Sequence, residues 1–166
     1  MFGGIGKNSY TRSCEAYDIV ENFWTMMESK LPTESNRNNA VTHRSLIYIT
    51  GLRLVDVVEF NPKTRSTRNL SQTWFATLNY EMDKGILAIG DSLLVLNADG
   101  RVVEINLDGE GVQQFQGPKF PDSHNFQSHV VRLGSQMYYM IQNSPIVYCL
   151  DIEKRRTEVF SEIILN

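Results

Sequence analysis

Short runs of aliphatic and aromatic residues recur along the chain, and clusters of turn-forming residues separate them. Leu46–Ile49, Leu93–Leu96 and Met137–Met140 are three such runs. Short apolar runs of this composition, bounded by Asn, Asp, Gly or Pro, are typical of β-strands joined by tight turns. One helix-like stretch is expected near Trp74–Met82, in the longest connection. The pattern therefore predicts a chain built almost entirely of strands.

A second set of segments recurs at a nearly constant interval. Each segment ends in an aromatic or aliphatic residue followed by Asp or Asn, and the final residues are Asp18, Asn61, Asn106 and Asp151. The steps between these residues are 43, 45 and 45 positions. A fixed period of this length indicates a repeat architecture, so the fold can be predicted from one repeat.

Each period contains four predicted strands. In the second, third and fourth periods they are expected at 39–43, 46–50, 55–60 and 65–70, then at 85–90, 92–97, 101–107 and 111–116, then at 129–133, 136–141, 146–152 and 156–161. Four strands in about 45 residues is the size of one propeller blade. We therefore expect an all-β fold of four-stranded antiparallel blades.

The first repeat resembles the Kelch motif. Phe2-Gly3-Gly4 is similar to the double glycine that ends the second strand of that motif, and Tyr17 and Trp24 match its spaced aromatic pair. The link into the next blade and the strand after it also match, at Leu31-Pro32, Arg37, Ala40-Val41 and Ile47–Gly51, with Thr50 in place of the first glycine. Glycines would let strands pack closely where a Cβ would clash. Tyr17 and Trp24 would pack between adjacent sheets.

The resemblance weakens after the first repeat. Thr67, Val112 and Thr157 stand at the positions equivalent to Trp24, and the last two repeats contain no double glycine. Repeats of the WD type have a similar period, but the chain contains no Trp-Asp pair. The WD type therefore ranks second to the Kelch type.

The resemblance implies one Kelch-like repeat domain over residues 1–166. Its parts would be a partial blade at 1–30 and three blades at 31–72, 73–117 and 118–166. Because propellers close with ~4–8 blades, about three and a half blades would form a partial or open ring. The uncovered blade faces are expected to meet further blades of a larger protein, another propeller half, or a larger complex.

Composition and charge narrow the classes of function. The chain is 42% hydrophobic with a net charge of −3, and it has no basic cluster of the kind that nucleic-acid binding requires. It has no apolar stretch long enough to span a membrane, and the first residues do not form a signal peptide. Cys14 and Cys149 fall in predicted strands, where buried reduced thiols are expected. These features favour a cytoplasmic location, with cytoskeletal association as one version of it.

The motifs that would indicate catalysis or a cofactor are incomplete. Gly3–Asn8 differs from a phosphate-binding loop, because Met1 and Asn8 stand where that motif needs Gly and Ser or Thr. His124 and His129 have no cysteine nearby and are interpreted as loop residues. We therefore expect no metal, no cofactor and no enzymatic activity. The alternative is a small sugar-modifying enzyme, since galactose oxidase and the sialic acid mutarotases use Kelch-like folds, although neither site maps onto these residues.

The resemblance also implies where a partner would bind. In Kelch proteins, the loops after the double glycine and the links between blades bind peptides, and the matching segments are Gly6–Arg12 and Thr33–Asn38. The candidate binding residues are Lys7, Tyr10, Arg12, Glu34 and Arg37. The expected function is a protein–protein interaction module: a substrate adaptor, a cytoskeletal binder or an assembly subunit. A purely structural subunit of a large complex is a further alternative.

Overall fold

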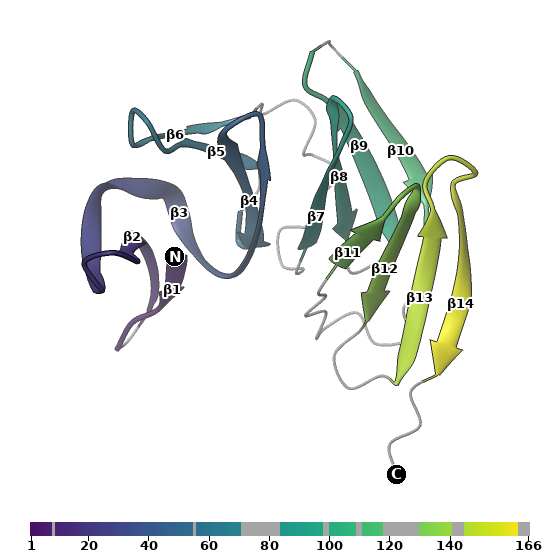
Figure 1. The fold of residues 1–166 in the computed structure, drawn as a ribbon, viewed down its shortest axis with the longest axis horizontal. Helices are drawn as coiled ribbons and strands as arrows, with labels where there is room; N and C mark the ends of the chain where they lie inside the picture. Colours follow the sequence, from purple (N-terminus) through teal and green to yellow (C-terminus); the bar gives the residue numbers. More distant parts are fainter. Residues whose placement is uncertain are drawn as a thin grey trace. The chain divides into compact units, whose positions relative to one another are not determined.

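The computed structural model describes residues 1–7, 9–54, 56–70, 84–97, 100–108, 111–117, 130–140 and 145–162, without the side chains of Arg37, Leu52 and Lys84 (Figure 1). All regular elements in these ranges are strands. They are β1 Phe2–Ile5, β2 Tyr10–Asp18, β3 Phe23–His43, β4 Leu46–Leu52, β5 Val58–Asn61, β6 Ser66–Asn69, β7 Lys84–Ile89, β8 Ser92–Asn97, β9 Arg101–Asn106, β10 Val112–Gln116, β11 Val130–Leu133, β12 Gln136–Met140, β13 Ile146–Asp151 and β14 Arg156–Glu162. The all-β prediction is confirmed. The helix-like stretch expected at 74–82 lies outside the described residues.

The chain divides into two compact units, residues 1–81 and 82–166. In the first unit, β1, β2 and the first part of β3 form sheet A, and the rest of β3 with β4, β5 and β6 forms sheet B. In the second unit, β7 to β10 form sheet C and β11 to β14 form sheet D. Neighbouring strands are consecutive and antiparallel in every sheet. The division into two compact units does not test the prediction that residues 1–166 form one domain.

One long strand joins the first two sheets. The first part of β3 pairs with β2, where Tyr17 lies opposite Trp24, and its last part pairs with β4, where Val41 lies opposite Tyr48. The strand expected at 39–43 is therefore the end of a longer element. Sheet A has three strands. Its first strand, β1, corresponds to the second strand of the other blades.

The core of each unit lies between its two sheets. In unit 1, buried Cys14 and Leu31 pack with Ile49 and Phe60, and the rings of Phe2 and Phe60 meet edge to face at 5.3 Å between centroids. Each large apolar side chain buried in this way stabilises the fold by about 1.5–3 kcal/mol.

In unit 2, the core side chains come from both sheets. They are Leu87, Leu94, Leu96 and Val102 from sheet C, and Met137, Tyr139, Tyr148 and Leu150 from sheet D. At the edge of this core, the guanidinium of Arg155, in the turn between β13 and β14, reaches Glu104 in sheet C at 3.3 Å. It also lies 5.2 Å from the ring centroid of Phe115. Both units are therefore stabilised by one sheet packing face to face on another.

The recurring Asp and Asn residues close the same hairpin turn in each repeat. The Asn61 Oδ1 atom accepts hydrogen bonds from the backbone N–H groups of Lys63 at 2.9 Å and Thr64 at 3.3 Å. Equivalent bonds are accepted from Val20 and Glu21 by Asp18, from Asp108 by Asn106, and from Lys154 by Asp151. Such side-chain bonds favour tight turns. The regular spacing of these residues therefore has a physical cause in the turn.

A left-handed residue completes the turn in three of the repeats. Asn22, Arg65 and Arg155 each stand four positions after the Asp or Asn, and their φ values are 55°, 54° and 52°. The equivalent residue of the remaining repeat lies outside the described residues. Non-glycine residues rarely adopt this conformation, so its recurrence supports a common turn geometry.

Glycines at the ends of two second strands let the link between blades pack against them. A Cβ on Gly3 would lie within van der Waals overlap of the Ser35 carbonyl oxygen, and a Cβ on Gly51 would overlap the Asn38 side chain. Asn38 Nδ2 donates to the Phe2 carbonyl oxygen at 2.6 Å, and Ser35 Oγ bonds Asn38 Oδ1 at 2.5 Å. The close packing expected of these glycines is therefore observed.

Asn61→Ala should lower the free energy of unfolding by about 1–2 kcal/mol, because two backbone N–H groups lose their acceptor. Asn61→Asp should keep most of the stability, since a carboxylate oxygen serves the same turn at Asp18 and Asp151. Urea denaturation followed by circular dichroism measures both variants. Equal midpoints for Asn61→Ala and the wild type would show that the turn does not depend on this bond.

Gly3→Ala should destabilise the chain more than Gly134→Ala. Both residues have nearly the same positive φ, 62° and 63°, but nothing lies within 4 Å of a Cβ on Gly134. The difference between the two variants therefore isolates the clash with the link, and overpacking of this kind costs about 1–3 kcal/mol. Thermal denaturation of both variants gives the comparison. A Gly134→Ala loss as large as the Gly3→Ala loss would contradict the account.

Candidate functional site

The loops expected to bind a partner come together at one end of sheet A. Thr11 pairs with Ser35, so the start of β2 runs beside the link within β3. Lys7 is exposed in the turn between β1 and β2, where the Gly6 N–H donates to the Ser9 carbonyl oxygen at 2.8 Å. Glu34 is exposed on the adjacent link. The segments 6–12 and 33–38 are therefore neighbours in space.

Arg12 supports the link. Its Nε donates a hydrogen bond to the carbonyl oxygen of Leu31, whose side chain is fully buried in the core of unit 1. A hydrogen bond from a charged donor is stronger than a neutral one. Substitution of Arg12 would therefore disturb the position of the link as well as any contact with a partner. The side chain of Arg37, the remaining candidate, lies outside the described residues.

Arg53 belongs to the same surface, although the sequence analysis did not select it. Its guanidinium carbon lies 4.5 Å from the ring centroid of Tyr10, in cation–π contact. The Thr33 hydroxyl bonds the Arg53 carbonyl oxygen at 3.4 Å. Arg53 directly follows β4, which ends at Leu52 just after Thr50-Gly51, so the repeat itself places Arg53 in the loop equivalent to residues 6–9.

Four residues therefore define one exposed region, which we call the loop surface: Lys7, Tyr10, Glu34 and Arg53. Two are cations, one is an acid and one is a half-buried aromatic residue whose ring supports a guanidinium. A guanidinium that lies over an aromatic ring can still bind carboxylate or carbonyl oxygens through its N–H groups. The arrangement can bind a polypeptide by charge and hydrogen bonding.

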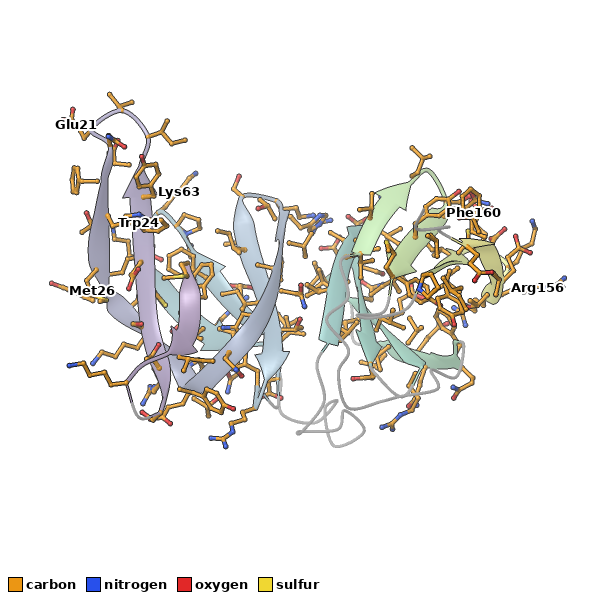
Figure 2. The ribbon with its side chains drawn as sticks, turned by 90° about the horizontal axis from the view of Figure 1, so that it is seen from below. Glu21, Trp24, Met26, Lys63, Arg156 and Phe160 are labelled. Carbon is orange, nitrogen blue, oxygen red and sulfur yellow. The ribbon has the colours of Figure 1, made fainter. Side chains whose placement is uncertain are left out.

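The spaced aromatic pair has a different environment from the one expected. Tyr17 and Trp24 lie opposite each other on β2 and β3, with ring centroids 5.1 Å apart. They are 43% and 58% exposed, on the face of sheet A opposite to Cys14. The expectation that they pack between two sheets is therefore wrong for the described residues. Figure 2 labels Trp24 and its neighbour Met26 along β3.

A groove of about 990 Å³ adjoins sheets A and B. Ala16, Thr25 and Phe23 line it from sheet A, and Phe60 and Pro62 line it from sheet B. Small side chains at 16 and 25 leave this space. The lining combines apolar side chains with charged ones, which are Glu15, Asp18, Glu28 and Arg65.

Among the described residues, several buried polar side chains lie near the loop surface, including Ser35, Asn36, Thr50 and Asp56. Asp56 and Asn36 are buried, and each has a side-chain oxygen without a hydrogen-bond partner among the described residues. Burial raises the pKa of the Asp56 carboxyl above its usual value, because the charged form loses hydration. Asp56 lies in the loop that also contains Arg53.

The described part of the chain contains no group of three His, Cys, Asp or Glu side chains placed to hold a metal ion. His124 and His129 lie outside it. Cys14 and Cys149 are free thiols buried in β2 and β13, as expected, and burial raises the pKa of both. None of the described residues forms a helix capable of crossing a membrane.

Two solved structures similar to this chain are β-propellers. The structure of YjhT matches with a TM-score of 0.74 and 12% sequence identity, over 98% of this chain and 67% of that one. A chain of the nidogen/laminin complex matches with a TM-score of 0.66 and 16% identity, over 95% of this chain and 57% of that one. The sequence matches no protein-family model and no curated protein.

At these identities the likeness concerns the fold, and the predicted fold class is confirmed. The chain spans little more than half of the propeller chain in the nidogen/laminin complex. The Kelch type of the repeats stays a prediction. The chain has the fold of a partial β-propeller, built of four-stranded blades with a three-stranded first blade.

Proposed function

We propose that this chain is a protein-interaction module of the Kelch type, which binds a partner polypeptide through the loop surface. Propeller folds carry their functions in loops held by a rigid scaffold. Here the scaffold is the link Thr33–Asn38 within β3, which packs against Gly3 and Gly51 and is held by the hydrogen bond of Asn38. In this role the chain binds its partner without catalysing a reaction. It resides in a reducing compartment, where its two buried thiols stay reduced.

The contact between Tyr10 and Arg53 is the observation that carries the proposal. It joins the loops of two successive blades and leaves an exposed guanidinium on an aromatic ring. Tyr and Arg are the residue types most often found at binding hot spots. Because the ring already orders the arginine, less side-chain entropy is lost when a partner binds.

The charges of the loop surface favour an acidic partner segment. Lys7 and Arg53 are exposed cations, and Glu34 is the one acid of the four defining residues. Arg12, whose Nε is occupied by the Leu31 carbonyl, adds a third positive charge beside them. An exposed, extended segment with Asp or Glu residues would satisfy both the guanidinium and the lysine.

Arg53→Glu should reduce capture of at least one partner about tenfold or more, the loss expected for a hot-spot residue. The tagged chain is purified from its native cells and the bound proteins are quantified by mass spectrometry. Lys63→Glu is the matched control, because it makes the same charge change in the exposed turn at the other end of β5. Circular dichroism verifies that both variants fold.

Two outcomes would contradict the proposal. If the wild-type chain captures no protein, the interaction role fails. If Arg53→Glu and Lys63→Glu capture the same proteins in the same amounts as the wild type, the loop surface is not the binding site.

A further inference from the structure

One arginine of unit 2 joins its two sheets by contacts with three side chains. The Arg155 guanidinium lies 3.3 Å from a carboxylate oxygen of Glu104 and 5.2 Å from the ring centroid of Phe115. It also donates a hydrogen bond to the side-chain carbonyl oxygen of Gln113. Glu104 belongs to β9 and the other two partners belong to β10, whereas Arg155 lies in the turn that follows β13. A carboxylate, an amide and an aromatic ring of sheet C therefore bind a guanidinium of the next blade.

Unit 1 repeats the backbone of this arrangement in sheet A. In sheet C, Gln113 lies opposite Glu104. In sheet A, Thr25 lies opposite Ala16. Glu104 and Ala16 each stand two positions before the recurring Asn or Asp of their repeat, and their partners each stand seven positions after it. The two pairs therefore occupy equivalent places on equivalent strands.

Arg65 is the counterpart of Arg155 in the blade that follows sheet A. Each arginine stands four positions after the recurring residue, which is Asn61 in one repeat and Asp151 in the other. Both arginines adopt a left-handed backbone conformation, with φ values of 54° and 52°. The two side chains therefore leave the same kind of turn from the same position.

The side chains that bind Arg155 are replaced around Arg65. Ala16, Thr25 and Met27 stand where unit 2 has the carboxylate, the amide and the ring. The Arg65 side chain is exposed and forms no hydrogen bond or ion pair with the described residues. All four of these unit 1 residues line the groove of about 990 Å³ between sheets A and B. The groove therefore lies where unit 2 places the partners of its arginine.

The acidic residues of the lining do not replace the missing carboxylate. Glu15 directly precedes Ala16 on β2, so its side chain projects from the other face of sheet A. Glu28 stands in the same alternation with Met27 on β3. The Oδ1 atom of Asp18 already accepts hydrogen bonds from two backbone N–H groups of its own turn. An anion that enters the groove can therefore take the place of Glu104.

Apolar and aromatic side chains complete the lining. Phe23 and Met27 come from sheet A, and Phe60 and Pro62 come from sheet B. Phe23 is 51% exposed, so its ring offers surface to a ligand. The volume of the groove lies within the range of about 300–1,000 Å³ that is usual for small-molecule sites. One guanidinium among apolar side chains is typical of a site for a ligand that is charged at one end and apolar at the other.

We propose that this groove binds a small aromatic carboxylate. The carboxylate binds the Arg65 guanidinium as Glu104 binds that of Arg155, and the aromatic ring packs on Phe23 and Met27. One ligand thus supplies both the carboxylate and the ring that unit 2 supplies from its own sheet. The groove lies at the hairpin-turn end of sheets A and B, whereas the loop surface lies at the other end of β2. The two proposals are therefore independent.

Binding of phenylacetate, measured by NMR on the isotope-labelled chain, tests the proposal. Phenylacetate joins a carboxylate to a phenyl ring and should bind with a dissociation constant of about 1 mM, which is usual for a ligand of its size. The backbone amides of Thr25 and Arg65 should shift most. Phenylacetamide, which has the same shape without the charge, should bind at least tenfold more weakly, because a guanidinium binds a carboxylate more strongly than a neutral amide.

Arg65→Ala should weaken phenylacetate binding at least tenfold, because it removes the group that binds the carboxylate. Arg155→Ala is the matched control, since it removes the same side chain from the equivalent turn of unit 2 and should leave the affinity unchanged. Circular dichroism verifies that both variants fold. Equal losses in the two variants would overturn the assignment of the site to Arg65.

The double variant Ala16→Glu with Thr25→Gln should close the site from within. It rebuilds around Arg65 the pair of acceptors that Arg155 has in unit 2. Its melting temperature should rise above that of the wild type, and phenylacetate should no longer bind. Three results overturn the proposal: no shift at Thr25 or Arg65 with phenylacetate up to about 20 mM, equal affinity for phenylacetamide, or undiminished binding by the double variant.

Discussion

The packing of one sheet face to face on the next is the interaction on which the rest of this structure depends. A four-stranded blade carries apolar side chains on both faces, so it cannot exclude water by itself. In unit 2, Leu94 and Leu96 of sheet C are buried by packing on Met137 and Tyr139 of sheet D. In unit 1, Phe60 of sheet B packs in the same way on Phe2 of sheet A. Repetition of the blade is therefore a consequence of burial, and exposed faces are expected wherever a blade has no neighbour.

Much of the fold could be predicted because its signals are local. The strand expected at 92–97 is β8, Ser92–Asn97, and the strands expected at 136–141 and 146–152 agree with β12 and β13 within one residue at each end. Turn chemistry explains the end of β13, because the side chain of its last residue, Asp151, accepts a hydrogen bond from the backbone N–H of Lys154 in the turn that follows. The continuity of β3 could not be predicted, because it depends on pairing between Thr11 and Ser35, far apart in sequence.

Less of the candidate site could be predicted, because it depends on neighbours in space. The expected segments do meet, but Arg12 proves to hold the Leu31 carbonyl, and Arg53 joins Tyr10 from the next repeat. Composition alone could not distinguish these roles. Tyr17 and Trp24 match a motif position that is buried when a blade covers it, and here they are exposed. At one repeat position the aromatic side chain is thus buried in Phe60 and exposed in Tyr17, according to what lies beside it.

Amide hydrogen exchange measured by NMR tests the packing of the blades most directly. Local stability follows burial and hydrogen bonding, so amides in the central strands β8, β9, β12 and β13 should exchange slowest and within a narrow range. Amides in the outer strands β10 and β14, whose side chains are mostly exposed, should exchange faster. Equally fast exchange in the central and outer strands of unit 2 would contradict the account, because it would mean that the two sheets do not protect each other.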